Sequence, residues 1–150
     1  MIQKLKNRID KEHLFNYGLN RWYNFWSEDA VETIFNLLQN VQPIRNMRDF
    51  RADFKIQGIR FDHKTTAYPK GNKNSLQSTM KKPEYVIKWL YLHQSSEHRK
   101  HFKNRLFIVM HSTDKFHWKL KAEICWLNEL IHKYVSGVTA KYIPQYNIGE

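Results

Sequence analysis

The sequence predicts a mixed α/β domain, α+β in character, in which a small sheet is flanked by helices. Two short runs on either side of Gly58, residues 50–56 and 59–65, alternate apolar and polar side chains, which is typical of the half-buried strands of a hairpin. Apolar residues recur at helical spacing before and after this hairpin. A continuous apolar run at 106–110 indicates a further buried strand. The expected order is helix, strand, strand, helix, strand, helix.

The first 26 residues are expected to form a helical extension of one or two short helices. An aromatic cluster ends this extension and consists of Trp22, Tyr23, Phe25 and Trp26. We expect this cluster to cap the core, with stacking on nucleic-acid bases as the alternative. Ser27 is predicted to cap a helix that runs to about Gln39. The buried stripe of that helix is spaced i, i+3, i+4, i+7 and comprises Val31, Ile34, Phe35 and Leu38.

A two-residue turn at Gln57-Gly58 would make residues 50–65 a hairpin. The apolar alternation then pairs Phe54 with Phe61 and places Asp53 opposite Asp62, with Lys64 on the same face. Carboxylates directly opposite each other repel, so we expect a divalent cation between them. A bulged turn or a slip of one residue would move Asp62 to the other face. The alternation turns His63 toward the apolar face, where a hydrogen-bonded, partly buried imidazole is expected.

The segments after the hairpin are predicted as a polar, lysine-rich loop at 67–82 and a helix from Pro83 to about Gln94. The buried stripe of this helix is Val86, Ile87, Leu90 and Tyr91. A strand over 106–110 and a helix over about 114–134 follow, with Gly137 as a left-handed cap. The tail, residues 139–150, is expected to hold a short edge strand at 141–143.

The chain of 150 residues is expected to be a single domain, 1–150. Its apolar fraction of 41% and aromatic fraction of 15% exclude a disordered basic tail. No apolar run reaches the length of a membrane span, and the N-terminus lacks the apolar centre of a secretory signal. Cys125 is the single cysteine, so no internal disulfide can form. It is interpreted as a small apolar residue on the stripe of a helix. These features predict a cytoplasmic protein.

The chain carries 25 lysines and arginines against 14 acidic residues, a formal net charge of +11. A surplus of this size favours a polyanionic partner, and DNA is the expected one. An inert basic surface is the alternative. The residues expected to contact the phosphate backbone lie in the strand end, the lysine-rich loop and the basic segment 98–105, and they are Thr65, Lys70, Lys73, Lys81, Lys82, Arg99, Lys100 and Lys103.

Asp53 followed by Asp62-His63-Lys64 resembles the catalytic signature of the PD-(D/E)xK nuclease superfamily, which includes restriction endonucleases and archaeal Holliday-junction resolvases. The resemblance covers roughly residues 27–112. It implies a restriction endonuclease-like core of order α-β-β-β-α-β, which requires one strand more than the sequence signals, near residues 44–49. Ala52 stands where the family signature has proline.

The resemblance implies that Asp53, Asp62 and the backbone carbonyl of His63 bind Mg²⁺ or Mn²⁺. It further implies that Lys64 orients or deprotonates the attacking water. A helix-borne acid would complete the site, with Glu32 preferred over Glu28. The implied activity is a metal-dependent DNA endonuclease in which water attacks the phosphodiester in one step.

Two other classes of function are open at this point. One is a non-catalytic, basic nucleic-acid-binding protein with the same fold, and the other is a basic scaffold for an acidic protein. In either case Asp53, Asp62 and Lys64 would form a solvated salt-bridge cluster. Zinc binding by His93, His98 and His101 is disfavoured because cysteine partners are lacking. The form of the DNA substrate, a homodimer through the aromatic N-terminal region and a separate specificity subunit stay open.

Overall fold

The fold was determined as a computed structural model, which describes residues 2–44, 52–72, 74–93, 104–139, 143–144 and 146, with side chains described from Asp10 onward. Along the chain, the helix α1 (Ile2–Asn36) precedes three strands, β1 (Val41–Pro43), β2 (Phe54–Ile56) and β3 (Ile59–Ala67). Two helices, α2 (Leu76–Lys81) and α3 (Glu84–His93), lead to β4 (Arg105–Met110). A 3₁₀ helix, η1 (His117–Ala122), and α4 (Ile124–Gly137) complete the described elements. The predicted mixed α/β class is confirmed.

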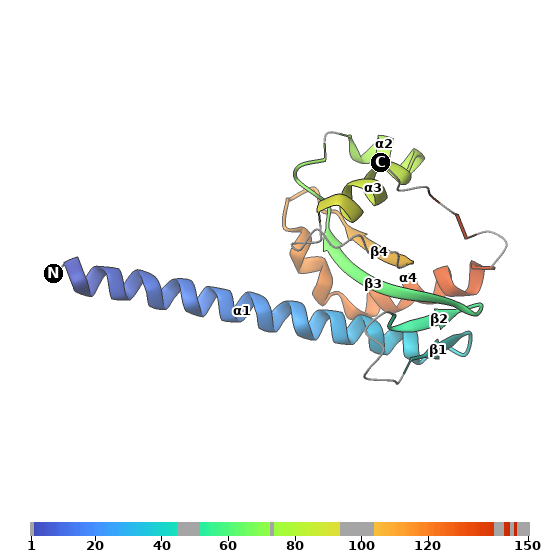
Figure 1. The fold of residues 1–150 in the computed structure, drawn as a ribbon, viewed down its shortest axis with the longest axis horizontal. Helices are drawn as coiled ribbons and strands as arrows, with labels where there is room; N and C mark the ends of the chain where they lie inside the picture. Colours follow the sequence, from blue (N-terminus) through green and yellow to red (C-terminus); the bar gives the residue numbers. More distant parts are fainter. Residues whose placement is uncertain are drawn as a thin grey trace.

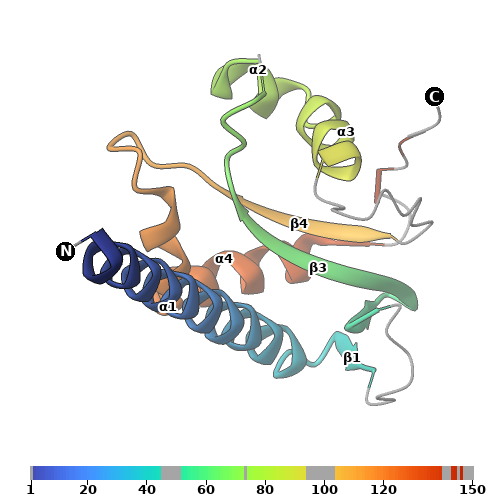
Figure 2. The same cartoon turned by 60° about the vertical axis from the view of Figure 1, so that its left-hand side comes forward.

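The four strands form one mixed sheet in the order β1-β2-β3-β4. β1, β2 and β3 are antiparallel neighbours, and β4 runs parallel to β3. α1 and α4 cover one face of this sheet, while α3 lies over the other (Figures 1 and 2). The side chains of β3 therefore alternate between an α1-facing layer and an α3-facing layer.

The hairpin register predicted from the sequence is confirmed over β2 and β3, where Phe54 pairs with Phe61 and Ile56 with Ile59. The turn residues Gln57 and Gly58 have φ values of 53° and 79°. Two consecutive positive φ values are the geometry of a type I′ turn, whose twist matches that of the flanking strands. The turn fixes which residues of β3 face α1.

The hydrophobic core lies between the sheet and the pair α1 and α4. The stripe predicted on α1 is buried there, and so are the inward residues of the hairpin, of β4 and of α4. The fully buried members with the largest side chains include Phe35, Phe54, Ile56, Met110 and Leu127. The rings of Phe35 and Phe54 stack with centroids 4.4 Å apart, which attaches α1 directly to β2.

The prediction that Ser27 begins a helix is wrong, because α1 runs without interruption from Ile2 to Asn36. The hydroxyl of Ser27 donates to the carbonyl of Asn24 within the helix, 3.1 Å away. Serine can form such a backward bond in a helix interior as readily as it can cap a helix. The predicted end near Gln39 is also displaced, since the helix stops at Asn36.

A third strand, β1, precedes the hairpin, and it lies earlier than the interval 44–49 in which the additional strand was expected. Residues 45–49 lie outside the described residues. Pro43 is tolerated in β1 because β1 is the edge strand of the sheet and proline cannot donate to a neighbour. A short helix, α2, capped by the side chain of Ser75, interrupts the predicted loop 67–82.

The predicted strand at 106–110 and the helix from Pro83 to Gln94 are observed as β4 and α3. Most side chains of β4 are partly buried, and Met110 alone is fully buried, so the strand is less enclosed than expected. Gly137 is the last residue of α4 and not a left-handed cap, because the cap is Val138 in extended geometry. The edge strand predicted at 141–143 falls largely outside the described residues. Cys125, expected on the apolar stripe of a helix, is exposed.

The aromatic cluster at the end of the predicted extension does not cap the core. Trp22, Phe25 and Trp26 are all more than half exposed, and Figure 1 shows the N-terminal part of α1 projecting beyond the rest of the protein. Tyr23 contacts Trp118 edge-to-face and donates to its carbonyl. Among the described residues, no helix has the length and apolar character needed to cross a membrane.

Candidate metal centre

Asp53 lies just before β2, where the ladder between β2 and β3 ends. In a regular ladder Asp53 would lie opposite Asp62. Its backbone N–H instead donates to the carbonyl of Phe61, the residue that already pairs with Phe54, so the regular pairing stops at Phe54. Beyond that point β2 offers no backbone acceptor to the N–H of His63. The Asp53 carboxylate accepts that bond, with Oδ2 2.7 Å from the His63 nitrogen. Asp53 therefore turns toward the α1 side of the sheet.

His63 extends from the centre of β3 into the α1-facing layer, and 4% of it is exposed. Its ring packs against the rings of Phe35 and Phe54, as the apolar alternation predicts. Its Nδ1 lies 3.1 Å from Asp53 Oδ2, and Nε2 is buried with no hydrogen-bond partner among the described residues. A carboxylate that holds one ring nitrogen of a histidine orients the ring, which is how metal-binding histidines are commonly positioned.

Glu32 reaches the same place from α1, on the flank of the buried stripe. One ligand atom each from Glu32, Asp53 and His63 lie within 4.8 Å of one another. Partial burial raises the pKa of Glu32, and the negative charge of Asp53 raises it further, while His63 acts in the opposite direction. Two carboxylates and an imidazole from three separate elements therefore converge on one partly buried point.

The pKa of Asp53 is lowered even though burial by itself would raise it. The hydrogen bonds from the ring and the backbone N–H of His63 stabilise the ionised carboxylate, and the charge of Lys64 adds to their effect. The neighbouring carboxylates thus respond oppositely to their surroundings. Asp53 is held as an anion, whereas Glu32 retains a proton to higher pH than a solvated glutamate.

The donor set fits a divalent transition-metal ion. Two ligands at about 2.1 Å from one ion can lie no more than about 4.2 Å apart, so the observed spacing needs only a small side-chain movement to close around an ion. An imidazole beside two carboxylates suits Mn²⁺, Fe²⁺ or Zn²⁺, whereas Mg²⁺ prefers oxygen ligands alone. Of the two ions expected from the sequence, Mn²⁺ is the better match to these donors.

The structure does not bring Asp62 and Lys64 to this point. They alternate with His63 along β3 and so lie in the α3-facing layer. There Asp62 forms ion pairs with Arg105, whose Nε is 3.2 Å from Oδ2, and with Lys64, whose Nζ is 3.6 Å from Oδ1. The expectation that Asp53 and Asp62 share one face is therefore incorrect, because the strand pairing that would have placed them opposite each other ends one residue earlier.

Glu32 and Glu28 were both candidates for the helix-borne acid, and the converging cluster contains Glu32. Glu28 lies one turn earlier and acts on a different group. Its charge raises the pKa of Lys121, although burial has the larger effect and lowers that pKa overall.

Two cations that the sequence did not single out are Lys121, which is buried, and Arg105, whose side chain is 9% exposed. Lys121, in η1, donates to the side chain of Asn24 from 2.9 Å. Arg105 also lies over the ring of Tyr91, with its guanidinium carbon 5.5 Å from the centroid. Neither stands out in the sequence, because each is one of many basic residues.

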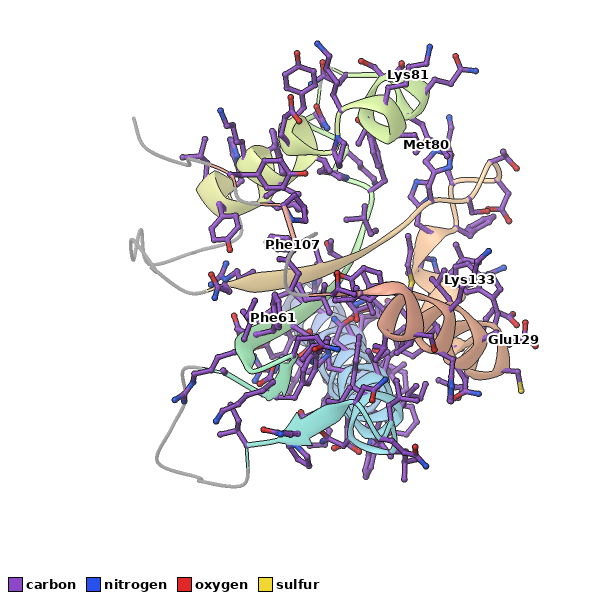
Figure 3. The ribbon with its side chains drawn as sticks, turned by 90° about the vertical axis from the view of Figure 1, so that its right-hand side faces the viewer. Phe61, Met80, Lys81, Phe107, Glu129 and Lys133 are labelled. Atoms are coloured by element: carbon purple, nitrogen blue, oxygen red, sulfur yellow. The ribbon has the colours of Figure 1, made fainter. Side chains whose placement is uncertain are left out.

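The predicted DNA-contacting residues are only partly described. Thr65 is buried in the α1-facing layer, so its hydroxyl is not available to a phosphate backbone. Lys70, Lys81 and Lys82 are exposed. Lys81 is the last residue of α2 (Figure 3), and Lys82 follows it as the C-cap. The remaining positions, which lie outside the described residues, are Lys73, Arg99, Lys100 and Lys103.

Comparison of the chain with protein-family models, with curated protein sequences and with solved structures finds no match.

Proposed function

We propose that this protein is a metal-dependent nuclease that cleaves phosphodiester bonds with Mn²⁺ held by Glu32, Asp53 and His63. The observation that carries the proposal is the convergence of these side chains from α1, the start of β2 and the centre of β3. The net charge of +11 supports nucleic acid, and DNA in particular, as the substrate.

The order of the elements adds support. α1, β1, β2, β3, α3 and β4 follow the α-β-β-β-α-β order of the restriction endonuclease-like core, with α2 as an addition. The proposed site differs from the PD-(D/E)xK pattern in one respect. His63 takes the position on β3 that faces the metal, while Asp62 and Lys64 face away from it.

A bound divalent ion would polarise a phosphoryl oxygen and lower the pKa of a water molecule beside it. The residues of the chain prepare the site for that chemistry. Asp53 stays ionised because its pKa is lowered, so it offers a negatively charged ligand across the neutral pH range. Glu32 has a raised pKa, which makes its carboxylate a better proton acceptor than a solvated glutamate. Both carboxylates are partly exposed, so water and a phosphate can reach them.

The test is cleavage of plasmid, single-stranded and branched DNA with Mn²⁺ or Mg²⁺ by the wild type and two matched variants, Asp53→Asn and Asp62→Asn. Cleavage should be stronger with Mn²⁺ and should be lost in Asp53→Asn. Asp62→Asn removes the same charge from the neighbouring layer and should retain cleavage when folded, which circular dichroism checks. Cleavage that survives in Asp53→Asn would contradict the proposal.

A second candidate function is a non-catalytic nucleic-acid-binding protein. It is favoured by the pairing of Asp62 with both Arg105 and Lys64, which gives the residues of the nuclease signature a structural role. This candidate predicts salt-dependent DNA binding without cleavage under any metal, in the wild type as well as in both variants.

A further inference from the structure

The projecting part of α1 carries a regular apolar seam that nothing in the described structure covers. Phe15, Gly18, Trp22 and Phe25 are spaced by three, four and three residues, which is the spacing of a coiled-coil seam. Phe15, Trp22 and Phe25 are 64%, 61% and 63% exposed. Apart from the nearby backbone of α1 and Gly18's two chain neighbours, no described atom lies within 4 Å of the position that a β-carbon at Gly18 would take. Such an arrangement of exposed rings is typical of a protein interface.

This seam lies on the side of α1 that faces away from the sheet. The buried residues of the helix begin at Ser27 and continue through Val31 and Ile34. At about 100° per residue, Ser27 lies about 160° around the helix from Phe25 and about 180° from Gly18. One helix thus uses one face to pack against its own domain and the opposite face for the seam.

The sequence around the seam reads nearly the same in both directions from Asn20. Positions equally distant from Asn20 carry Phe15 and Phe25, then Asn16 and Asn24, then Tyr17 and Tyr23. The small residue Gly18 is the counterpart of the largest residue, Trp22. Further out, Lys11 is the counterpart of Asp29, so the charges are opposite, and Leu14 is the counterpart of Trp26. Two antiparallel copies of such a helix place each residue beside its counterpart.

We propose that the protein forms a homodimer in which the α1 helices of two copies pack antiparallel around a two-fold axis level with Asn20. Trp22 of each copy packs over Gly18 of the other, and Phe15 contacts Phe25. Lys11 and Asp29 form an ion pair at each end of a contact about 27 Å long. This inference does not depend on the proposed nuclease activity.

The size of the seam and its charges specify a second copy as the occupant. Its exposed apolar residues, with the flanking side chains, are Leu14, Phe15, Leu19, Trp22, Phe25 and Trp26. Their exposed area is on the order of 700 Å² per copy, close to the roughly 800 Å² per partner of a stable interface. A parallel pair would place Lys11 beside Lys11 and Trp22 beside Trp22, so charge and shape both favour the antiparallel arrangement.

Sedimentation equilibrium of the full chain, over a concentration series that reaches about 200 μM, tests the proposal. We expect a monomer–dimer equilibrium in the wild type and at least about tenfold weaker association in Trp22→Ala and in Gly18→Glu. Asn20→Ala, on the opposite face of the same helix, should leave the dimer unchanged. Because these side chains are exposed in the single chain, the variants should keep the wild-type melting profile when dilute.

Charge reversal tests the direction of the helices. Lys11→Asp alone and Asp29→Lys alone should each weaken the dimer, and the two together should restore it, because each altered residue then meets its altered counterpart. A wild type that stays monomeric throughout the series overturns the proposal. So does a dimer that tolerates Trp22→Ala, or one that the double reversal weakens further.

Discussion

One carboxylate oxygen of Asp53, Oδ2, lies 2.7 Å from the backbone nitrogen of His63 and 3.1 Å from its Nδ1. The same side chain thus closes the open end of the β2–β3 ladder and fixes the orientation of the buried ring. Stability and the proposed metal chemistry depend on this one contact, so changes at Asp53 affect both.

Asp53→Ala should destabilise the protein by about 1–3 kcal/mol at pH 7, because the N–H of His63 loses its acceptor. The pKa of Asp53 is lowered below its ordinary value of 3.8 in the folded state. Its contribution is therefore present above about pH 4 and is lost as the pH falls through the folded pKa. Urea unfolding of both proteins at pH 7 and at about pH 3 should show a smaller difference at the lower pH. An equal difference at both would argue against an ionic contribution from Asp53.

Glu32→Gln should raise the melting temperature of the metal-free protein at pH 7 by a small amount, about 1–3 °C, because Glu32 is partly solvated. Its pKa is raised above 4.5, so the folded state disfavours the ionised form. The contribution of Glu32 to stability is therefore fully present below about pH 4.5 and decreases as the pH rises through the folded pKa. The variant should lack that decrease. Thermal melts in chelator from pH 4 to pH 8 provide the measurement, and a variant less stable than the wild type at pH 7 would refute the assignment.

Arg105→Ala should destabilise the fold by about 3–5 kcal/mol, because it leaves the buried carboxylate of Asp62 with a single, partly exposed partner in Lys64. Arg105→Ala combined with Asp62→Ala should recover part of this loss, since no buried charge then lacks its partner. Denaturant unfolding of the single and double variants measures the coupling. Independent, additive effects would show that the ion pair is not a structural element.

The turn of the hairpin gives two opposite predictions. Gln57→Asn should stabilise the protein by about 0.5 kcal/mol, because asparagine tolerates the positive φ of 53° better than glutamine does. Gly58→Ala should cost about 1 kcal/mol, since its φ of 79° strains any residue with a side chain. Gln42→Ala, on the exposed part of β1, is a neutral control. Changes of the same sign at Gln57 and Gly58 would contradict the type I′ geometry.

The sequence predicted the features that depend on local periodicity. The alternation around Gly58 specifies the hairpin and its register, because a slip of one residue would expose Phe54 and Phe61. The stripe that contains Val31 and Ile34 predicts which side of α1 meets the sheet. The inward orientation of His63 follows from the same alternation, and the structure agrees with it.

The features that the sequence did not predict are those that local periodicity does not determine. Alternation determines which face a side chain takes only inside a paired strand, and Asp53 lies one residue before β2. The orientation of its side chain instead follows from the N–H of His63, which has no acceptor on β2 and donates to the Asp53 carboxylate. Ser27 carries no local signal that separates a helix cap from a helix interior. Nothing in the sequence signals that Trp22 is exposed. An aromatic residue that packs inside its own chain and one that is available to another chain have the same sequence pattern.

The most direct test of the central claim is a Mn²⁺ titration followed by electron paramagnetic resonance, with wild type, Asp53→Asn and Asp62→Asn in parallel. The proposed centre predicts one site in the wild type, an affinity at least about tenfold lower in Asp53→Asn and a nearly unchanged affinity in folded Asp62→Asn. Loss of Mn²⁺ binding in Asp62→Asn with binding retained in Asp53→Asn would contradict the assignment of the ion to Glu32, Asp53 and His63.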